Sequence, residues 1–432
     1  MKCAGKCFVF IFLLFYMIYC SILAHAQHKN ICISSKSDPE EVTLCIDPLK
    51  PNIIVAGANT EHYYYSGDTG RTWKDGSMRS SFGVWGDLCM LVDSLGNFYC
   101  FHLSKMETGN AYDRLICQKS YDKGATWTNG TYLGVNSDYS QDKEWAAIDP
   151  VTNYIYVTWT EQKESYSHSS YGQKTKTNIM LSVSKDLGHT WSKSMRINEK
   201  PGADFSDWKS VIGAMPAIGP NHEVYATWVN YDALFFDRSL DSGKTWLDKD
   251  ILIDSLSYKW SMKVSGMYRC YTFPIMACDA GKGKYNGNIY ICWADQNKDN
   301  SNTDIFLSKS TDNGDTWTKP MKVNNDTTVR HQYMPWITVD QVTGIVYIVF
   351  YDRRHHGNSK TDVYMATSFD GGESFINTKI NKSSFTPNNS TFMGDYIGIA
   401  AHNDIVRPIW TTMDDHQNMS IWTAIIDVLK LK

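Results

Sequence analysis

Six short segments of the chain repeat nearly the same eight residues, and this repetition limits the possible fold more than any other feature. Each copy begins with serine, has aspartate two residues later and glycine after two more, and ends in threonine–tryptophan, or in serine–phenylalanine in the last copy. The copies span 66–73, 120–127, 184–191, 239–246, 310–317 and 368–375. Repeats spaced by tens of residues are typical of propellers and solenoids.

Each repeat predicts a tight turn between two strands. An aspartate carboxylate can accept hydrogen bonds from backbone N–H groups just downstream, and serine or threonine can do the same more weakly. Glycine suits a position with positive φ, where a side chain is penalised. The residues before the repeats alternate or run apolar, as in 178–183, 304–309 and 362–367, which is typical of strands.

The pattern S/T-x-D-x-G-x-T-W resembles the Asp box, or BNR repeat, of the sialidase-like β-propellers. The resemblance extends over nearly the whole chain after residue 26 and implies an all-β propeller of four-stranded antiparallel blades. It also implies that the repeated aspartates are structural and lie on the face away from the active site. These aspartates are Asp68, Asp122, Asp186, Asp241, Asp312 and Asp370.

The spacing of the repeats predicts the number of blades. Successive repeat aspartates lie 54 to 71 residues apart, which suits four-stranded blades with loops of different length. After the last repeat, three strand-like segments (396–401, 405–411 and 420–426) lack a fourth. The segment 30–34 offers a spare strand, and donating it to the last blade would remove an exposed sheet edge. We therefore expect seven blades, with six as the alternative.

The first 26 residues predict a secretory signal, followed by one propeller domain over 27–432. Lys2 and Lys6 precede an apolar run over 8–24, and Ala24-His-Ala26 matches a cleavage site. The prediction is export to the periplasm or the extracellular space, with no membrane span after cleavage. The alternative is a membrane anchor, because the run is close to the minimum length for spanning.

Composition limits the classes of molecule that the protein is expected to bind. Without Lys2 and Lys6 the formal charge of −4 becomes about −6, and no basic stripe is present, which argues against a nucleic-acid partner. Aromatic residues make up 13% of the chain and can pack the blades or line a sugar-binding mouth.

Six of the eight cysteines after residue 26 fall in expected strands. Cys89/Cys100 and Cys278/Cys292 could face each other across neighbouring strands, the alternative being buried thiols.

The candidate site residues lie in the loops that lead into the first strand of a blade and in those that join its second and third strands. Both kinds of loop share the face opposite the repeats, where the resemblance places an active site. The catalytic candidates are Tyr396, Asp87, Asp142, Arg330, Arg353 and Arg354. The binding candidates are Glu144, Trp145, Tyr333, Trp336 and Asp395.

Paired aspartates on the same face form a separate candidate site. Asp295 with Asp304, and Asp352 with Asp362, each join the end of an expected second strand to the start of the third. They either cap turns or bind a hard cation such as Ca²⁺, which prefers clustered carboxylates. No cofactor is required by either alternative.

The resemblance stops short of a complete catalytic set. Enzymes of the sialidase-like family use three arginines, a tyrosine nucleophile with a glutamate partner and an aspartate acid/base, and their first arginine lies in an Arg-Ile-Pro motif before the first repeat. This chain has no arginine between Gln27 and Gly70. The sequence therefore predicts a secreted propeller that binds glycans or other extracellular ligands on the face opposite the repeats. The alternatives are an exo-α-sialidase-type glycoside hydrolase and a protein-interaction or adhesion scaffold.

Overall fold

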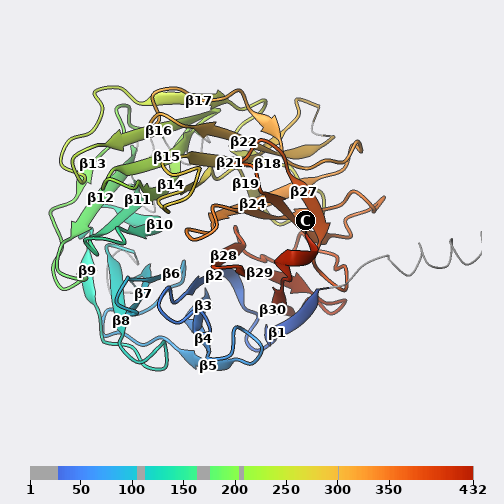
Figure 1. Cartoon of the computed structure of the whole chain (residues 1–432), viewed down its shortest axis with the longest axis horizontal. Helices are drawn as coiled ribbons and strands as arrows, with labels where there is room; N and C mark the ends of the chain where they lie inside the picture. Colours follow the sequence, from blue (N-terminus) through green and yellow to red (C-terminus); the bar gives the residue numbers. More distant parts are fainter. Residues whose placement is uncertain (1–27, 105–111, 163–175, 204–208, 300, 432) are drawn as a thin grey trace, which may run out of the picture.

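The chain folds into a ring of seven four-stranded antiparallel sheets, with one additional two-stranded hairpin (Figure 1). The structure, a computed structural model, describes residues 28–104, 112–162, 176–203, 209–299 and 301–431. The predicted signal segment 1–26 lies outside the described residues. The predicted all-β propeller with seven blades is confirmed, and the six-bladed alternative is wrong.

Blades one to six each use four consecutive strands of the chain. The first three blades contain β2 (Glu40–Ile46), β3 (Ile54–Asn59), β4 (His62–Ser66) and β5 (Lys74–Ser77); β6 (Cys89–Val92), β7 (Phe98–Leu103), β8 (Leu115–Ser120) and β9 (Thr131–Leu133); and β10 (Ser140–Ile148), β11 (Ile155–Gln162), β12 (Thr177–Ser184) and β13 (Met195–Arg196). The next three contain β14 (Val211–Ile218), β15 (Val224–Asn230), β16 (Ala233–Ser239) and β17 (Ile251–Ser255); β20 (Ile275–Cys278), β21 (Ile289–Gln296), β22 (Thr303–Ser310) and β23 (Met321–Lys322); and β24 (Gln332–Val339), β25 (Val346–Asp352), β26 (Asp362–Ser368) and β27 (Ile376–Lys379).

Blade seven closes the ring with strands from both ends of the chain. It contains β28 (Gly398–His402), β29 (Ile405–Met413) and β30 (Met419–Ile425), and the N-terminal β1 (Lys29–Ser34) pairs with β30 as its fourth strand. This is the predicted strand donation. A short 3₁₀ helix, η2 (Val428–Lys430), follows β30, and the hairpin β18 (Ser261–Met262) and β19 (Cys270–Tyr271) lies between blades four and five.

The six repeats form the predicted turns between the third and fourth strands of blades one to six. In the fifth turn the Ser310 hydroxyl donates to Asp312 Oδ1 at 2.7 Å and accepts the Gly314 N–H at 2.8 Å. The Thr316 N–H donates to Asp312 Oδ1 at 2.9 Å. The same three bonds recur in all six copies. The repeated carboxylates therefore serve their own turns.

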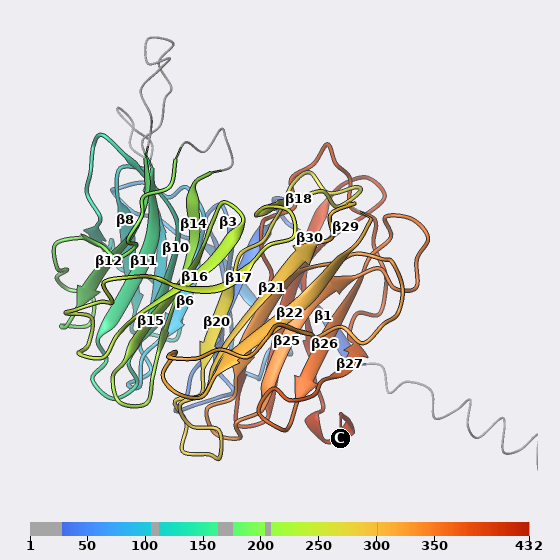
Figure 2. The same ribbon diagram turned by 90° about the horizontal axis from the view of Figure 1, so that it is seen from above.

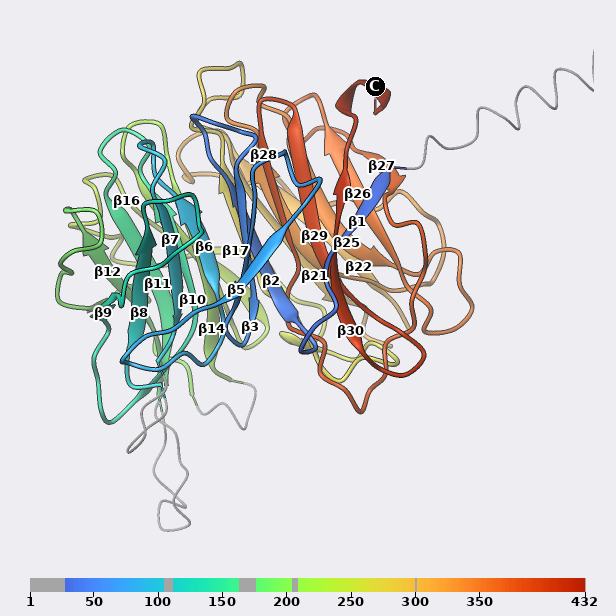
Figure 3. The same ribbon diagram turned by 90° about the horizontal axis from the view of Figure 1, so that it is seen from below.

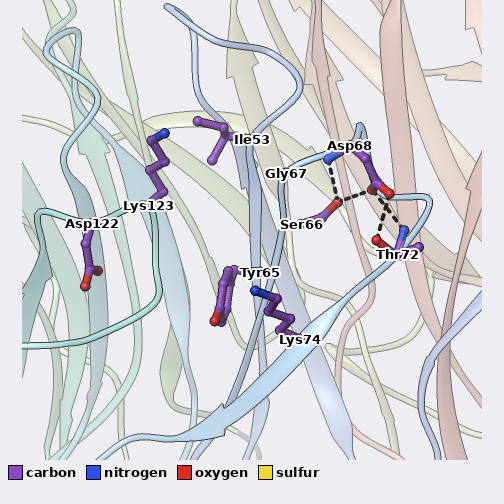
Figure 4. A pocket seen from close by; sticks show the side chains of 9 residues that line it. All are labelled: Ile53, Tyr65, Ser66, Gly67, Asp68, Thr72, Lys74, Asp122 and Lys123. Carbon is purple, nitrogen blue, oxygen red and sulfur yellow. Dashed lines mark hydrogen bonds between the residues drawn. The ribbon is translucent and has the colours of Figure 1, made fainter.

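All six turns lie on one face of the ring, which we call the turn face; the opposite face is the loop face. In the side view of Figure 2 the loop face is uppermost, with β18 near its edge, and the C-terminal end lies on the turn face. The view from the other side in Figure 3 shows the long strands of each blade running between these two faces. A cavity of about 300 Å³ separates the first two turns (Figure 4), and there the Asp68 carboxylate is held by Ser66 and Thr72.

The turns also connect neighbouring blades. In four blades a basic side chain donates to a backbone carbonyl in the turn of the next blade around the ring. These contacts are Lys119 to Leu187 at 3.5 Å, Arg238 to Asn313 at 2.7 Å, Lys309 to Gly371 at 3.0 Å and Arg407 to Thr69 at 2.7 Å. Arg407 lies in blade seven, which has no repeat, and joins it to the turn of blade one across the closure of the ring.

The cysteines fill the core as free thiols. All eight described cysteines are unpaired, and seven of them are buried. The expectation that Cys89 faces Cys100 is wrong, because Cys89 lies opposite Phe101 and Cys100 opposite Met90. The pairing of Cys278 with Cys292 is also wrong, since their partners are Ile289 and Ile275. The first pair is offset by one residue in register and the second by three, and an odd offset places the two side chains on opposite faces of the sheet.

No helix among the described residues has the length and apolar character needed to cross a bilayer.

Candidate functional site

In five blades the innermost strand, or the segment leading into it, has a residue with positive φ near the loop face. Glu41, Asp87 and Lys143 have φ values of 50°, 53° and 52°, and the registers of blades one and three shift at this point. Gly213 and Met334 occupy the equivalent positions of blades four and six, with φ values of 79° and 51°. A β-bulge of this kind redirects a side chain at a sheet edge and is frequent beside functional sites.

The bulges of the first three blades bring charged side chains to the axis of the ring. Lys143 Nζ lies 3.2 Å from Glu41 Oε1, 3.0 Å from Asp87 Oδ2 and 3.1 Å from Asp395 Oδ2. None of these four side chains is more than 7% exposed. We call this group, together with Glu40, Asp142 and Arg269, the axial cluster. It joins blades one, two, three and seven, so it spans the closure of the ring.

The hairpin β18–β19 places Arg269 beside the cluster. The Arg269 guanidinium donates two hydrogen bonds to Asp395, at 2.7 and 2.6 Å, and lies 4.2 Å from the centre of the Phe392 ring. A second contact holds the same hairpin to blade six, because Arg353 donates to the Ser265 carbonyl at 2.6 Å. The Arg269 side chain remains 36% exposed and therefore forms part of the loop face.

Burial and charge divide the carboxyls of the cluster into two kinds. Burial raises the pKa of Glu40 to about 8, and the neighbouring Asp87 charge acts in the same direction. Burial likewise raises the pKa of Asp142 to about 7, although Lys143 partly offsets it. Burial opposes ionisation of Asp87 as well, but Lys143 and hydrogen bonds from its neighbours outweigh it and hold the pKa of Asp87 well below its usual range. Near neutral pH, protonated and ionised carboxyls thus lie side by side.

Aromatic rings surround the cluster. The rings of Trp145, Trp336 and Tyr396 lie 5.9 to 6.0 Å apart from one another, centre to centre, and Lys143 Nζ lies 5.6 Å from the centre of the Tyr396 ring. The Tyr396 hydroxyl is 3.5 Å from Asp87 Oδ1. Burial and the nearby carboxylates raise the pKa of Tyr396 well above its usual value, which keeps this phenol protonated.

Several of the site residues named from the sequence meet at the axial cluster. Asp87, Asp142 and Asp395 belong to it, and Trp145, Trp336 and Tyr396 pack beside it. Glu144 follows Lys143 and is 1% exposed, and neither of its carboxylate oxygens has a hydrogen-bond partner among the described residues. Burial and the Asp87 charge raise the pKa of Glu144 well above its usual value.

The other predicted residues lie elsewhere. Arg353 is 2% exposed and donates to Thr361 and to the Tyr333 hydroxyl, which fixes both Arg353 and Tyr333 within blade six. Arg354 pairs with Asp352 at 2.7 Å and lies over the Tyr364 ring. Arg330 is exposed and forms no ion pair with any described residue. These three arginines therefore do not converge with Arg269 on the axial cluster.

The aspartate pairs proposed for a cation lie opposite each other in the sheets, Asp295 to Asp304 and Asp352 to Asp362. Cationic side chains already contact three of these carboxylates. Lys322 lies 2.7 Å from Asp304, Arg354 is paired with Asp352, and Lys379 lies 2.8 Å from Asp362. Within the described ranges, no group of three or more His, Cys, Asp or Glu has the arrangement of a metal site. The pairs as arranged here do not fit a calcium site.

Sequence reasoning did not single out Glu41 or Lys143, although a signal for them exists. In the first three blades a charged bulge residue lies six positions before an aspartate at the end of the innermost strand. The pairs are Glu41 and Asp47, Asp87 and Asp93, and Lys143 and Asp149. These aspartates cap the next turn, as when Asp47 Oδ1 accepts the Leu49 N–H at 2.8 Å. The bulge residue can therefore be located in the sequence by counting six positions back from the capping aspartate.

Comparison with known proteins supports the fold. The chain is similar to a protein of unknown function from Dyadobacter fermentans, with 15% identity, a TM-score of 0.50 and coverage of 79% of this chain and 97% of that one. It is similar to the NanB sialidase from Streptococcus pneumoniae, with 9% identity, a TM-score of 0.50 and coverage of 86% and 83%. It is also similar to an ulvan lyase of polysaccharide lyase family PL25, with 11% identity, a TM-score of 0.51 and coverage of 94% and 98%.

No protein-family model matches the sequence, and no curated protein matches it. At these identities the similarities establish the architecture and leave the chemistry to the site itself. The chain has a sialidase-like β-propeller fold with seven blades.

Proposed function

We propose that the protein binds carbohydrate on the loop face, over the axial cluster and the aromatic side chains beside it. The observation that carries this proposal is the convergence of charged and aromatic residues from five blades and one hairpin near the axis. Propeller axes and loop ends are common locations for ligand sites. The prediction of export over residues 1–26 fits a ligand outside the cell.

Two exposed aromatic side chains are placed to stack on a sugar ring. Trp85 lies two residues before Asp87 and is 38% exposed. Tyr268 precedes Arg269, is 56% exposed and packs against Phe392 with 6.0 Å between ring centres. Aromatic rings of this kind provide large rigid contact surfaces at small entropic cost. They flank the cluster from blade two and from the hairpin.

The charge of the cluster favours a neutral sugar. Burial raises the pKa of three of its five carboxyls, Glu40, Glu41 and Asp142, and the two cations, Lys143 and Arg269, are already engaged with carboxyls of the cluster. An acidic ligand would bring another negative charge to this site without a free arginine to pair with it. Two structures of the same fold, the NanB sialidase and the ulvan lyase bound to -[GlcA(1-4)Rha3S]-, carry carbohydrate-directed names. This chain therefore shares their general class of ligand in our proposal, but not their acidic sugars.

Glycan-array binding tests this function. We expect binding to neutral glycans in preference to sialylated or uronate-containing ones, and a loss of roughly tenfold in affinity, about 1.4 kcal/mol, for Trp85→Ala and for Tyr268→Ala. The matched control is Tyr121→Ala, because Tyr121 is 61% exposed on the turn face. Equal binding by all three variants, or selective binding of sialylated glycans, would contradict the proposal.

A second function, glycoside hydrolysis, is favoured by one observation. Burial raises the pKa of the Asp142 carboxyl to about 7, whereas Lys143 holds the pKa of the neighbouring Asp87 well below its usual range. Carboxyl pairs whose pKa values are driven apart are typical of general acid and base partners in glycosidases. If this pair is catalytic, fluorogenic glycosides will be turned over with a rate that depends on pH near 7, and Asp142→Asn will abolish turnover. In sialidase-type chemistry Tyr396 would be the nucleophile, so Tyr396→Phe and an α-sialoside substrate distinguish the two mechanisms.

A further inference from the structure

The other end of the propeller axis contains a second, unrelated site. A cavity of about 840 Å³ opens on the turn face where the innermost strands end, and all seven blades contribute to its wall. We call it the axial cavity. It lies at the opposite end of the innermost strands from the axial cluster, and the two share no residue.

Small side chains create this space. Each innermost strand ends in a turn, and one residue of the strand lies two positions before that turn. This residue is half-buried in most blades, and in blade two it is Leu91. In blades three, five and six the same position carries Ala147, Ala277 and Thr338, which also line the cavity. Alanine and threonine leave volume that leucine would fill. The cavity is thus a consequence of the sequence at one position of the repeat.

The wall and the rim are mainly apolar. Val151 and Val342 line the cavity and are 71% and 54% exposed. Each follows the turn aspartate by two residues, and Leu49 and Leu95 occupy the same position in blades one and two, with 61% and 59% exposure. Exposed aliphatic side chains gathered around a hollow are typical of a surface that binds an apolar ligand.

Among the described residues that line the cavity, Lys282 is the one Lys, Arg, Asp or Glu, and His402 and Gln341 add two polar side chains. Lys282 is exposed and forms no ion pair with any described residue. The turn aspartates, in contrast, accept hydrogen bonds from their own turns, such as Val342 N–H to Asp340 at 2.9 Å and Val151 N–H to Asp149 at 2.8 Å, and none of them lines the cavity. The charge offered to a ligand is therefore positive and lies at the rim of an apolar space.

We infer that the axial cavity binds a free fatty acid, with the alkyl chain among Leu91, Ala147 and Ala277 and the carboxylate at Lys282. The apolar wall excludes water from the chain, and the ammonium group attracts the anionic head. The hollow shape argues against a second copy of the protein as the occupant, because two such faces placed together would enclose an empty space.

Titration of the delipidated full-length protein with laurate, followed by calorimetry and by displacement of a fluorescent fatty-acid analogue, tests this inference. We expect saturable binding at one site, loss of binding in Ala277→Phe, and a five- to tenfold weaker affinity in Lys282→Glu. Lys244→Glu is the matched control, since Lys244 lies exposed in a repeat turn on the same face. Ala147→Leu, a smaller filling change, keeps the test valid if Ala277→Phe fails to fold.

Other outcomes would overturn the inference. Laurate binding with unchanged affinity in both filled variants would place the ligand elsewhere. Dodecanol binding as tightly as laurate would remove the role of Lys282. Binding to phosphatidylcholine–phosphatidylglycerol vesicles without binding of free laurate would identify a membrane surface, and concentration-dependent dimerisation lost in Ala277→Phe would identify a second copy as the occupant.

Discussion

The turn face and the loop face of this propeller differ in what is repeated from blade to blade. On the turn face the repeat is chemical as well as geometric, because serine, aspartate, glycine and a threonine or serine make the same bonds in all six copies. At the bulges near the loop face only the geometry repeats, and the side chains differ: Glu41, Asp87, Lys143, Gly213 and Met334. A uniform repeat is what stability requires, whereas varied side chains on a constant backbone can assemble a specific site. The difference assigns a stabilising role to the repeat turns and, in our proposal, carbohydrate binding to the bulges.

The largest expected effect comes from the centre of the axial cluster. Lys143→Met removes the cation shared by Glu41, Asp87 and Asp395 and leaves the buried Asp87 without an ion-pair partner, whereas Asp395 keeps Arg269. We expect a loss of about 3–5 kcal/mol in the free energy of unfolding, measured with urea at neutral pH, because breaking a buried ion pair from one side carries a cost of this size. Lys123→Met, at an exposed position of the second turn, is the control and should change stability by less than about 0.5 kcal/mol. A loss for Lys143→Met no larger than the control would show that the cluster is not held by this lysine.

A smaller effect is expected on the turn face. Asp312→Ala deletes three hydrogen bonds within one turn, so we expect a loss of about 1–2 kcal/mol in urea unfolding, without any change in ligand binding. Asp370→Ala, in the last repeat, should behave in the same way, because Asp370 makes the same three bonds and accepts one more from the Glu373 N–H. Loss of carbohydrate binding in a variant that remains stable would mean that the carbohydrate site lies on the turn face.

The two faces should also respond to pH in opposite directions. Hydrogen bonds from Thr190 lower the pKa of Asp186 to about 2, so the stability from this turn is present above the unfolded pKa and is lost as pH falls toward 2. For the buried carboxyls of Glu40, Asp142 and Glu144 the folded pKa is raised, so stability falls as pH rises from about 5 to 8. Each such carboxyl contributes at most about 1.4 kcal/mol per pH unit.

Glu144→Gln isolates the second of these effects. The amide carries no proton to lose, so we expect the variant to match the wild type near pH 5 and to be more stable at pH 8, by roughly 1 kcal/mol or more. Glu199→Gln, at an exposed position, is the control. Parallel stability curves for Glu144→Gln and the wild type between pH 5 and 8 would show that Glu144 ionises in the folded protein at its usual pKa.

The sequence alone predicted the architecture because its signals are local. Turn chemistry depends on residues within one repeat, and the strand segments between repeats are short and apolar, so the positions of the turns and the presence of a seventh blade follow from the order of residues along the chain. The strand donated by residues 29–34 followed from the same argument, since three strand-like segments at the C-terminal end lacked a fourth.

The positions of the candidate site and of the cavities follow from the tertiary structure and not from local sequence. Lys143 lies 102 residues from Glu41 and 252 from Asp395, and only closure of the ring brings their side chains within 3.2 Å. Contacts with Thr361 and Asp352 hold Arg353 and Arg354 in blade six, and a shift of one residue in register separates Cys89 from Cys100. The hydrogen bonds of a turn form between near neighbours in the chain, so the sequence determines them directly. Contacts across the axis depend on the summed geometry of seven blades, which no segment of the sequence contains.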